Sequence, residues 1–152
     1  MKRTLLLTLI LTIAIPLMAF SAFAGKAQIR MEAKTSLLQV GQEETIKVVV
    51  NTPTPIGAYQ FAISSDSSAL EIVDVQAGPD GVIMAASKAH GLVKVNGFDV
   101  DGKGPGELDF LLIKVKAKAQ GKVTISVKPV VFADVEGQKI PVSGSSLSLS
   151  IE

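Results

Sequence analysis

The chain has 152 residues, of which 47% are hydrophobic and 19% are charged, and its formal net charge is +1. A net charge this close to zero does not favour binding to nucleic acid or to anionic lipid. It contains no cysteine, which excludes a disulfide framework, thiolate metal ligation and lipid attachment through cysteine. Stability must therefore come from burial of apolar surface, which a chain of this length can achieve in one domain.

The first 24 residues have the three parts of a secretory signal peptide. Two basic residues open the chain, residues 4–20 carry no charge, and Ala22-Phe23-Ala24 presents small residues at the positions that signal peptidase recognises. The uncharged run is nearly long enough to be a retained membrane anchor, but Pro16 and the cleavage site favour removal. We expect cleavage after Ala24, no stable membrane anchor afterwards, and a protein that is secreted, periplasmic or held at the cell surface.

Residues 25–152 read as one domain of short strands, because apolar residues recur with a period of two between turns rich in Gly, Pro, Asn and Asp. Strands are expected at residues 29–34, 45–51, 57–65, 70–75, 92–98, 108–118, 123–128 and 146–151. Residues 78–91 are expected to form a loop with a short strand at 82–85, and residues 99–106 a second loop. No window predicts an amphipathic helix, and no internal repeat or second domain is visible.

The alternation also predicts which side chains face the interior. Tyr59, Phe61 and Ile63 share one side of their strand, and Leu111, Ile113, Val115 and Ala117 share one side of theirs, while Val123, Ile125 and Val127 alternate with polar residues. About nine such strands at this spacing are typical of an all-β sandwich of the jelly-roll type. The fold class expected is therefore all-β, a β-sandwich of about nine strands.

The sequence contains few residues that could support catalysis. The single histidine, His90, has no nucleophile elbow or related motif beside it, and a lone loop histidine is usually a solvated side chain. Paired carboxylates could serve a glycosidase, but none of the acids has a distinctive context. The candidate acids are Asp66, Glu71, Asp99, Asp101 and Glu107. We expect no enzymatic activity, no catalytic residues and no cofactor.

One acidic segment resembles a calcium loop only weakly. Asp99 and Asp101 are the candidate metal ligands, but Lys103 and Phe110 occupy the fifth and twelfth positions, where a calcium loop needs oxygen ligands. A Gly-rich turn stabilised by Asp side chains explains the same residues. Calcium therefore stays open as an alternative to a plain turn.

Sugar binding is weakly supported, because sugar platforms need exposed flat aromatic rings. The chain has no Trp and a single Tyr, and the alternation points Tyr59 inward. A polysaccharide ligand remains an alternative to a protein partner.

Two segments resemble the cohesin-domain family. Residues 57–72, GAYQFAISSDSSALEI, are similar to the cohesin segment in which a strand runs into a Tyr-Asp-Pro-x-x-Leu-Glu-like turn. Residues 106–118 resemble the Gly-x-Leu strand of that family, and Gly41-Gln42 with the valine-rich strand after it also fits. The resemblance covers residues 28–151. This chain departs from the family by having Ser65-Asp66-Ser67 at the Tyr-Asp-Pro turn.

The resemblance implies a nine-stranded jelly roll and a receptor role, because cohesins hold dockerin-bearing proteins, often polysaccharide-degrading enzymes, on a scaffold. In the family, a sheet face that includes the third, sixth and eighth strands meets the dockerin. The matching outward positions here are Ala58, Gln60 and Ala62, then Lys94 and Asn96, then Thr124, Ser126 and Lys128. Familiar dockerin-binding cohesins carry Asn and Asp where this chain has Ala58 and Gln60.

The sequence thus predicts an exported, non-catalytic, cohesin-like module that attaches a protein of the dockerin-bearing type at the cell surface or in an extracellular polysaccharide-degrading assembly. Two alternatives remain: a carbohydrate-binding module of the same fold, and a structural subunit of a surface or secretion assembly.

Overall fold

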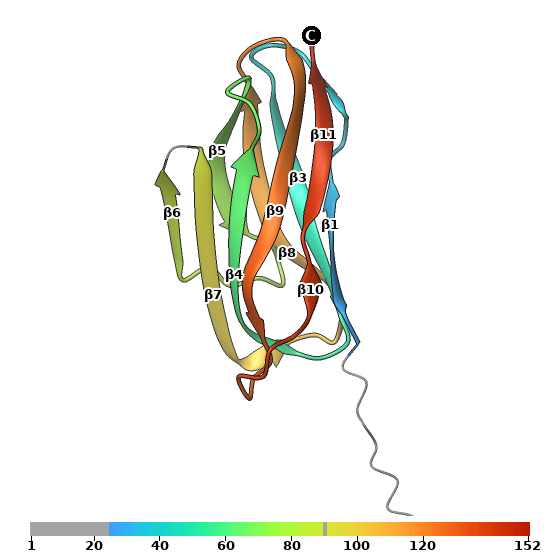
Figure 1. Cartoon of the computed structure of the whole chain (residues 1–152), viewed down its shortest axis with the longest axis vertical. Coiled ribbons are helices and arrows are strands. Elements are labelled where there is room, and N and C mark those ends of the chain that lie inside the picture. The colour runs from blue at the N-terminus through green and yellow to red at the C-terminus, as the bar shows by residue number, and fades with distance from the viewer. Residues whose placement is uncertain (1–24, 90) are drawn as a thin grey trace, which may run out of the picture.

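The computed structural model describes residues 25–89 and 91–152, which form two β-sheets packed face to face (Figure 1). Sheet A has the strand order β10-β1-β3-β8-β5, and sheet B has the order β2-β11-β9-β4-β7-β6. The strands of sheet A are β1 (Ala27–Glu32), β3 (Glu43–Thr52), β5 (Leu70–Ala77), β8 (Gly106–Ala117) and β10 (Val142–Ser143). Those of sheet B are β2 (Leu37–Leu38), β4 (Ile56–Ser65), β6 (Ala85–Ala89), β7 (Leu92–Lys103), β9 (Gly121–Ala133) and β11 (Ser145–Ile151).

This architecture confirms the all-β sandwich predicted from the sequence. Of the eleven strands, β2 and β10 have two residues each, and the remaining nine are the strands expected for a jelly roll. Within the described residues no helix is long and apolar enough to cross a membrane. The predicted signal peptide (residues 1–24) and His90 lie outside the described residues.

The core lies between the sheets and follows the predicted alternation. In β4 (Ile56–Ser65), Tyr59, Phe61 and Ile63 are buried, whereas Ala58, Gln60 and Ala62 are half-buried on the opposite side. The predicted inward residues of β8 and β9 are likewise buried. Because most of the strands bury one face, a period of two in the sequence is enough to assign most of the interior.

An aromatic cluster fills the centre of the core. Tyr59, Phe61, Phe110 and Phe132 pack with ring centroids 4.6 to 6.4 Å apart, mostly in tilted or edge-to-face arrangements. Phe110 reaches the cluster because β8 bulges at this residue, where the register with β3 skips from Leu111 to Asp109. The bulge therefore lets both Phe110 and its neighbour Leu111 face the interior.

Two sequence predictions of local structure were wrong. The short strand expected at residues 82–85 lies instead at Ala85–Ala89 (β6), and the loop expected at 99–106 begins later, because β7 continues to Lys103. All five residues of β6 are exposed, and the last residues of β7 are exposed or half-buried. A strand that buries neither face shows no apolar alternation, so the sequence contained no signal from which to place these ends.

The loop from β5 to β6 crosses from sheet A to sheet B and is held by the core. Gly78 N donates to Phe110 O at 2.9 Å, and Asp109 N donates to Asp80 Oδ2 at 2.8 Å. On the sheet B side, the Tyr59 hydroxyl contacts the Val82 carbonyl, and Val82 N donates to the same hydroxyl at 3.2 Å. Tyr59 thus links the aromatic cluster to the crossover loop.

The ionisation of Tyr59 offers a direct test of this arrangement. Burial raises the pKa of Tyr59 above its ordinary value, and the hydrogen bond with Val82 opposes the shift only in part. Protonated Tyr59 therefore makes its full contribution to stability below about pH 10, where free tyrosine titrates, and this contribution is lost as the pH rises through the higher folded pKa.

The chain contains one Tyr and no Trp, so tyrosinate absorbance reports this residue alone. We expect an absorbance midpoint above about pH 10 for the folded protein and a return to about 10 in denaturant. Tyr59→Phe should abolish the signal, and equal midpoints in the two states would show that the ring is not buried.

Candidate functional site

The predicted partner-binding residues lie on three adjacent strands of sheet B. Strand β4 is central and pairs antiparallel with β7 on one side and with β9 on the other. Ala62 pairs with both Lys94 and Lys128, and Gln60 pairs with Asn96. Ser126 pairs with Ser64, and Thr124 lies farther along β9. The eight residues therefore share one continuous surface, the outer face of sheet B.

Rows of paired residues cross this face and change character along the strands. One end is apolar, because Phe98 and Ala133 flank Ala58 in register. The middle row is cationic, with Lys94 and Lys128 on either side of Ala62. The far end is lined by hydroxyl groups. These belong to Ser64, Ser126, Thr124, Ser146 and Ser148.

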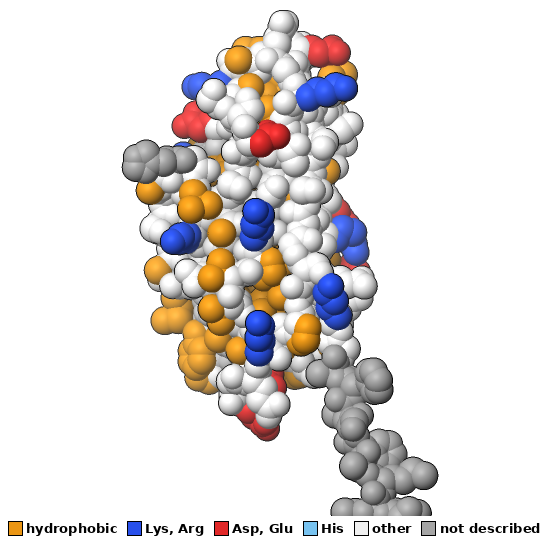
Figure 2. Space-filling model, in the orientation of Figure 1, with side chains coloured by type: hydrophobic (Ala, Val, Ile, Leu, Met, Phe, Trp, Pro, Cys, Tyr) orange, Lys and Arg blue, Asp and Glu red, His pale blue; other side chains and the backbone are white. Residues whose placement is uncertain are grey.

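The apolar end was not predicted from the sequence. Phe98 is 52% exposed and Val131, which pairs with Gln60, is 48% exposed. Beside them Val130 is also exposed, because the register of β9 with β4 skips this residue between Pro129 and Val131. Figure 2 shows hydrophobic side chains gathered over the lower parts of β4 and β7, where this end of the face lies. The apolar end is defined here as Ala58, Phe98, Val130, Val131 and Ala133.

The lysines of this face have no anionic neighbours on it. The outward side chains of β4, β6, β9 and β11, and those of β7 from Leu92 to Val100, include no Asp or Glu among the described residues. Lys94 and Lys128 form no ion pair with any described residue, and both are exposed. The outer face of sheet B therefore combines apolar side chains with uncompensated positive charge.

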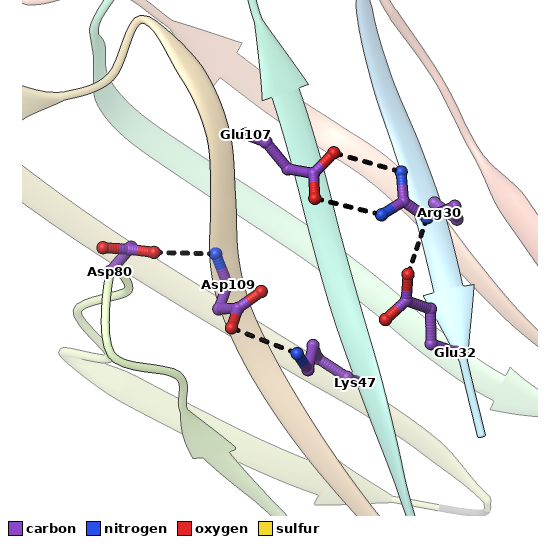
Figure 3. Close-up of polar contacts among 6 residues, drawn as sticks. All are labelled: Arg30, Glu32, Lys47, Asp80, Glu107 and Asp109. Carbon is purple, nitrogen blue, oxygen red and sulfur yellow. Dashed lines mark hydrogen bonds and ion pairs between the residues drawn. The ribbon is translucent and has the colours of Figure 1, made fainter. Parts of the chain in front are cut away.

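The outer face of sheet A is of the opposite kind, because its charges neutralise one another. Arg30 makes a two-pronged contact with Glu107 at 3.2 and 3.3 Å and bonds Glu32 at 2.8 Å (Figure 3). Lys47 Nζ lies 3.2 Å from Asp109 Oδ2. A further pair, Lys114 with Glu43 at 2.8 Å, lowers the pKa of the Glu43 carboxyl through its hydrogen bond.

Cross-strand pairing of this kind is typical of a solvated sheet surface. The contrast makes sheet B the candidate binding face.

Three of the acidic residues that were candidates for catalysis take part in structural contacts. Asp66 Oδ1 accepts a hydrogen bond from Thr124 N at 2.7 Å, and Glu107 is bound by Arg30. Glu71 lies 3.5 Å from Lys118 and 3.9 Å from Lys88, beside a shallow depression of about 500 Å³. Asp66 also lines this depression, and each of the two carboxylates there already has a structural partner.

The two candidate calcium ligands lie in the last part of β7. Asp99 Oδ2 is 3.4 Å from Lys103 Nζ, and Asp99 Oδ1 accepts a hydrogen bond from Asp101 N at 3.0 Å. Within the described ranges no group of three or more His, Cys, Asp or Glu side chains converges. The ammonium group of Lys103 thus lies beside the carboxylate that a calcium ion would have to bind.

Stability should consequently be independent of calcium. Lys103 already neutralises Asp99, and a calcium site needs six or more oxygen ligands, which this segment does not supply. Thermal melts with excess chelator and with added calcium should superimpose. A calcium-dependent rise of the midpoint would show that Asp99 and Asp101 bind the ion.

A two-sheet sandwich with one apolar and cationic outer face has the surface of a binding module. The chain belongs to the cohesin-domain family, which matches residues 28–151. Cohesins are protein–protein binding modules, so the predicted class of protein is confirmed. No curated protein sequence matches the chain significantly.

Solved cohesins share the fold at low sequence identity. The cohesin module of a family 33 glycoside hydrolase from Clostridium perfringens superposes with a TM-score of 0.72 at 10% identity, over 84% of this chain and 97% of that one. A non-cellulosomal cohesin from the archaeon Archaeoglobus fulgidus gives a TM-score of 0.68 at 17% identity, over 84% and 92%. The sixth cohesin of scaffoldin B from Acetivibrio cellulolyticus, solved in complex with a Cel5 dockerin, gives 0.65 at 19% identity, over 84% and 98%.

Proposed function

We propose that this protein is an exported cohesin module that binds a dockerin-bearing partner through the outer face of sheet B. The observation that carries the proposal is the difference between the two outer faces. Sheet A pairs its own charges, whereas sheet B exposes Phe98 and Val131 beside Lys94 and Lys128, which have no ion-pair partner in the part of the chain that the structure describes. Exposed apolar surface next to polar residues is typical of a protein interaction site.

The strand arrangement supports the same face. Ala58, Gln60 and Ala62 form the central strip, and residues from β7 and β9 border it on both sides. Both edges of β4 are hydrogen-bonded within the sheet, so a partner must bind through side chains rather than by adding a strand. The neighbours solved as cohesin–dockerin complexes support a dockerin as the partner.

A sugar ligand is less well supported by this surface. Among the described residues Phe98 is the one exposed aromatic side chain, since Tyr59, Phe61, Phe110 and Phe132 are buried. A single ring provides no platform along which a polysaccharide could stack.

The proposal is tested with the dockerin modules encoded by the source organism. Each purified dockerin is passed over the immobilised exported protein, and binding is measured by surface plasmon resonance. Saturable binding of at least one dockerin is expected, with no response to soluble polysaccharides. Polysaccharide binding without any dockerin binding would overturn the assignment.

The proposed export also predicts the N-terminus of the mature protein. The mature protein should begin at Gly25, because Ala22-Phe23-Ala24 follows an uncharged segment of signal-peptide length. The mass of the protein recovered outside the cytoplasm checks this. Retention of the first 24 residues there would contradict cleavage and indicate that the uncharged segment stays as a membrane anchor.

A further inference from the structure

We infer that the partner presents to this face a large apolar residue and, about 13 Å from it, a carboxylate. The inference rests on the proposed binding face and specifies the chemistry of what it binds. The apolar residue would lie on the apolar end beside Phe98, and the carboxylate would lie over Ala62 between Lys94 and Lys128.

The small side chains at Ala58 and Ala62 leave room for the apolar residue and for the carboxylate of the partner. Ala58 and Ala62 are the lowest points of the central strip, and each is flanked by longer side chains from β7, β9 or both. Neighbouring strands lie about 4.8 Å apart, so the Cα atoms of Lys94 and Lys128 lie about 10 Å from each other across Ala62. A carboxylate placed over Ala62 is therefore within reach of both ammonium groups.

The spacing between the two contacts selects the sequence separation in the partner. Four residues separate Ala58 from Ala62, which corresponds to about 13 Å along an extended strand. An α-helix rises about 1.5 Å per residue and returns to the same face after seven or eight residues, or about 11–12 Å. A partner helix lying along β4 would therefore carry the two groups seven or eight positions apart.

The charge of the face excludes a second copy of this chain as the occupant. Two copies stacked through this surface would bring two Lys94 and two Lys128 side chains together, and the outward residues of β4, of β9 and of β7 from Leu92 to Val100 provide no carboxylate to pair with them. Like charges at an interface cost several kcal/mol. Complementarity instead requires a partner that supplies acidic groups.

The test uses a library of helices displayed on a three-helix scaffold with the exposed positions of one helix randomised. The library is selected on the full exported protein and depleted on its Ala62→Arg variant. The enriched helices should carry a large apolar residue with Asp or Glu seven or eight positions from it. Enriched helices without the acid, helices with Lys or Arg at that position, or a failure to enrich any helix would each overturn the inference.

A charge exchange then checks the contact itself. Replacing the acid of an enriched helix with lysine should weaken binding about tenfold or more, and the protein variant Lys94→Glu with Lys128→Glu should restore it. Lys26→Glu with Lys34→Glu is the control, because it changes the net charge equally at positions outside sheet B. Restoration by the control pair, or none by Lys94→Glu with Lys128→Glu, would overturn the contact.

Dockerin binding separates this inference from the proposed function. If the selected helices behave as expected while no dockerin binds, the dockerin assignment alone fails. If a dockerin binds with equal strength to the wild-type protein and to Lys94→Glu with Lys128→Glu, the inferred partner chemistry alone fails.

Discussion

Replacing Ala62 with arginine should abolish partner binding while leaving the fold intact. Ala62 is in the middle of β4, between the buried residues Phe61 and Ile63, and its methyl group points away from the core. A side chain added there extends into solvent, so the packed interior is not disturbed. In a complex, however, the arginine would stand at the lowest point of the central strip and hold the partner away from the sheet.

The bulk of the arginine, and not its charge, is what opposes binding. Ala62 pairs with Lys94 and Lys128, so the added side chain fills the space between the two lysines that the partner has to enter. Loss at the centre of an interface usually costs more than about 2 kcal/mol, equivalent to about a thirtyfold or greater weakening. Surface plasmon resonance with a bound dockerin measures the loss, and an unchanged thermal midpoint verifies the fold.

Two control variants test whether the loss of binding is specific to the centre of this face. Lys128→Ala removes one exposed charge at the border of the strip and should weaken binding by about 1 kcal/mol or less. Asn51→Arg places the same bulky cation on an exposed strand position of sheet A and should leave binding unchanged. If Ala62→Arg binds as well as the wild type, the binding surface lies elsewhere, and the 99–106 segment is the next to be tested.

Strand alternation predicted the interior of this protein because most strands bury one face and expose the other. Tyr59, Phe61 and Ile63 could be assigned to the core without knowing which strands are neighbours. The pairing of β4 with β7 and β9 could not be obtained in this way. It is set by long-range contacts, and only the resemblance to cohesins indicated it.

The apolar end of the binding face shows what alternation misses. Continuing the pattern of β9 from Val127 through Pro129 would bury Val131 and expose Phe132. The bulge at Val130 adds one residue, so Phe132 is buried and Val131 faces solvent. A bulge leaves no period in the sequence by which to recognise it. Phe98, in contrast, continues the outward series of Lys94 and Asn96 and could have been identified from the sequence.

Replacing Gly97 with alanine should strongly destabilise the fold, although the substitution adds a single methyl group. Gly97 is in β7 with its Cα facing the core, and an added Cβ would overlap the Val82 carbonyl oxygen and the Tyr59 ring with its hydroxyl. Val82 belongs to the crossover loop, which is itself held against β8 by Gly78 and Asp80. Neither the loop backbone nor the buried ring can therefore move aside easily.

Overpacking of this kind costs up to about 3 kcal/mol, which corresponds to a fall of about 10 °C in the midpoint of thermal unfolding. Gly41→Ala is the control for the loss of glycine itself, because Gly41 has φ +90 and open space around it, so only backbone strain of about 1 kcal/mol is expected. In a Tyr59→Leu background the cost of Gly97→Ala should shrink, since two of the three nearest atoms belong to that tyrosine. If Gly97→Ala costs the same in both backgrounds, the overlap with Tyr59 is not what makes glycine necessary, and the Val82 carbonyl alone imposes it.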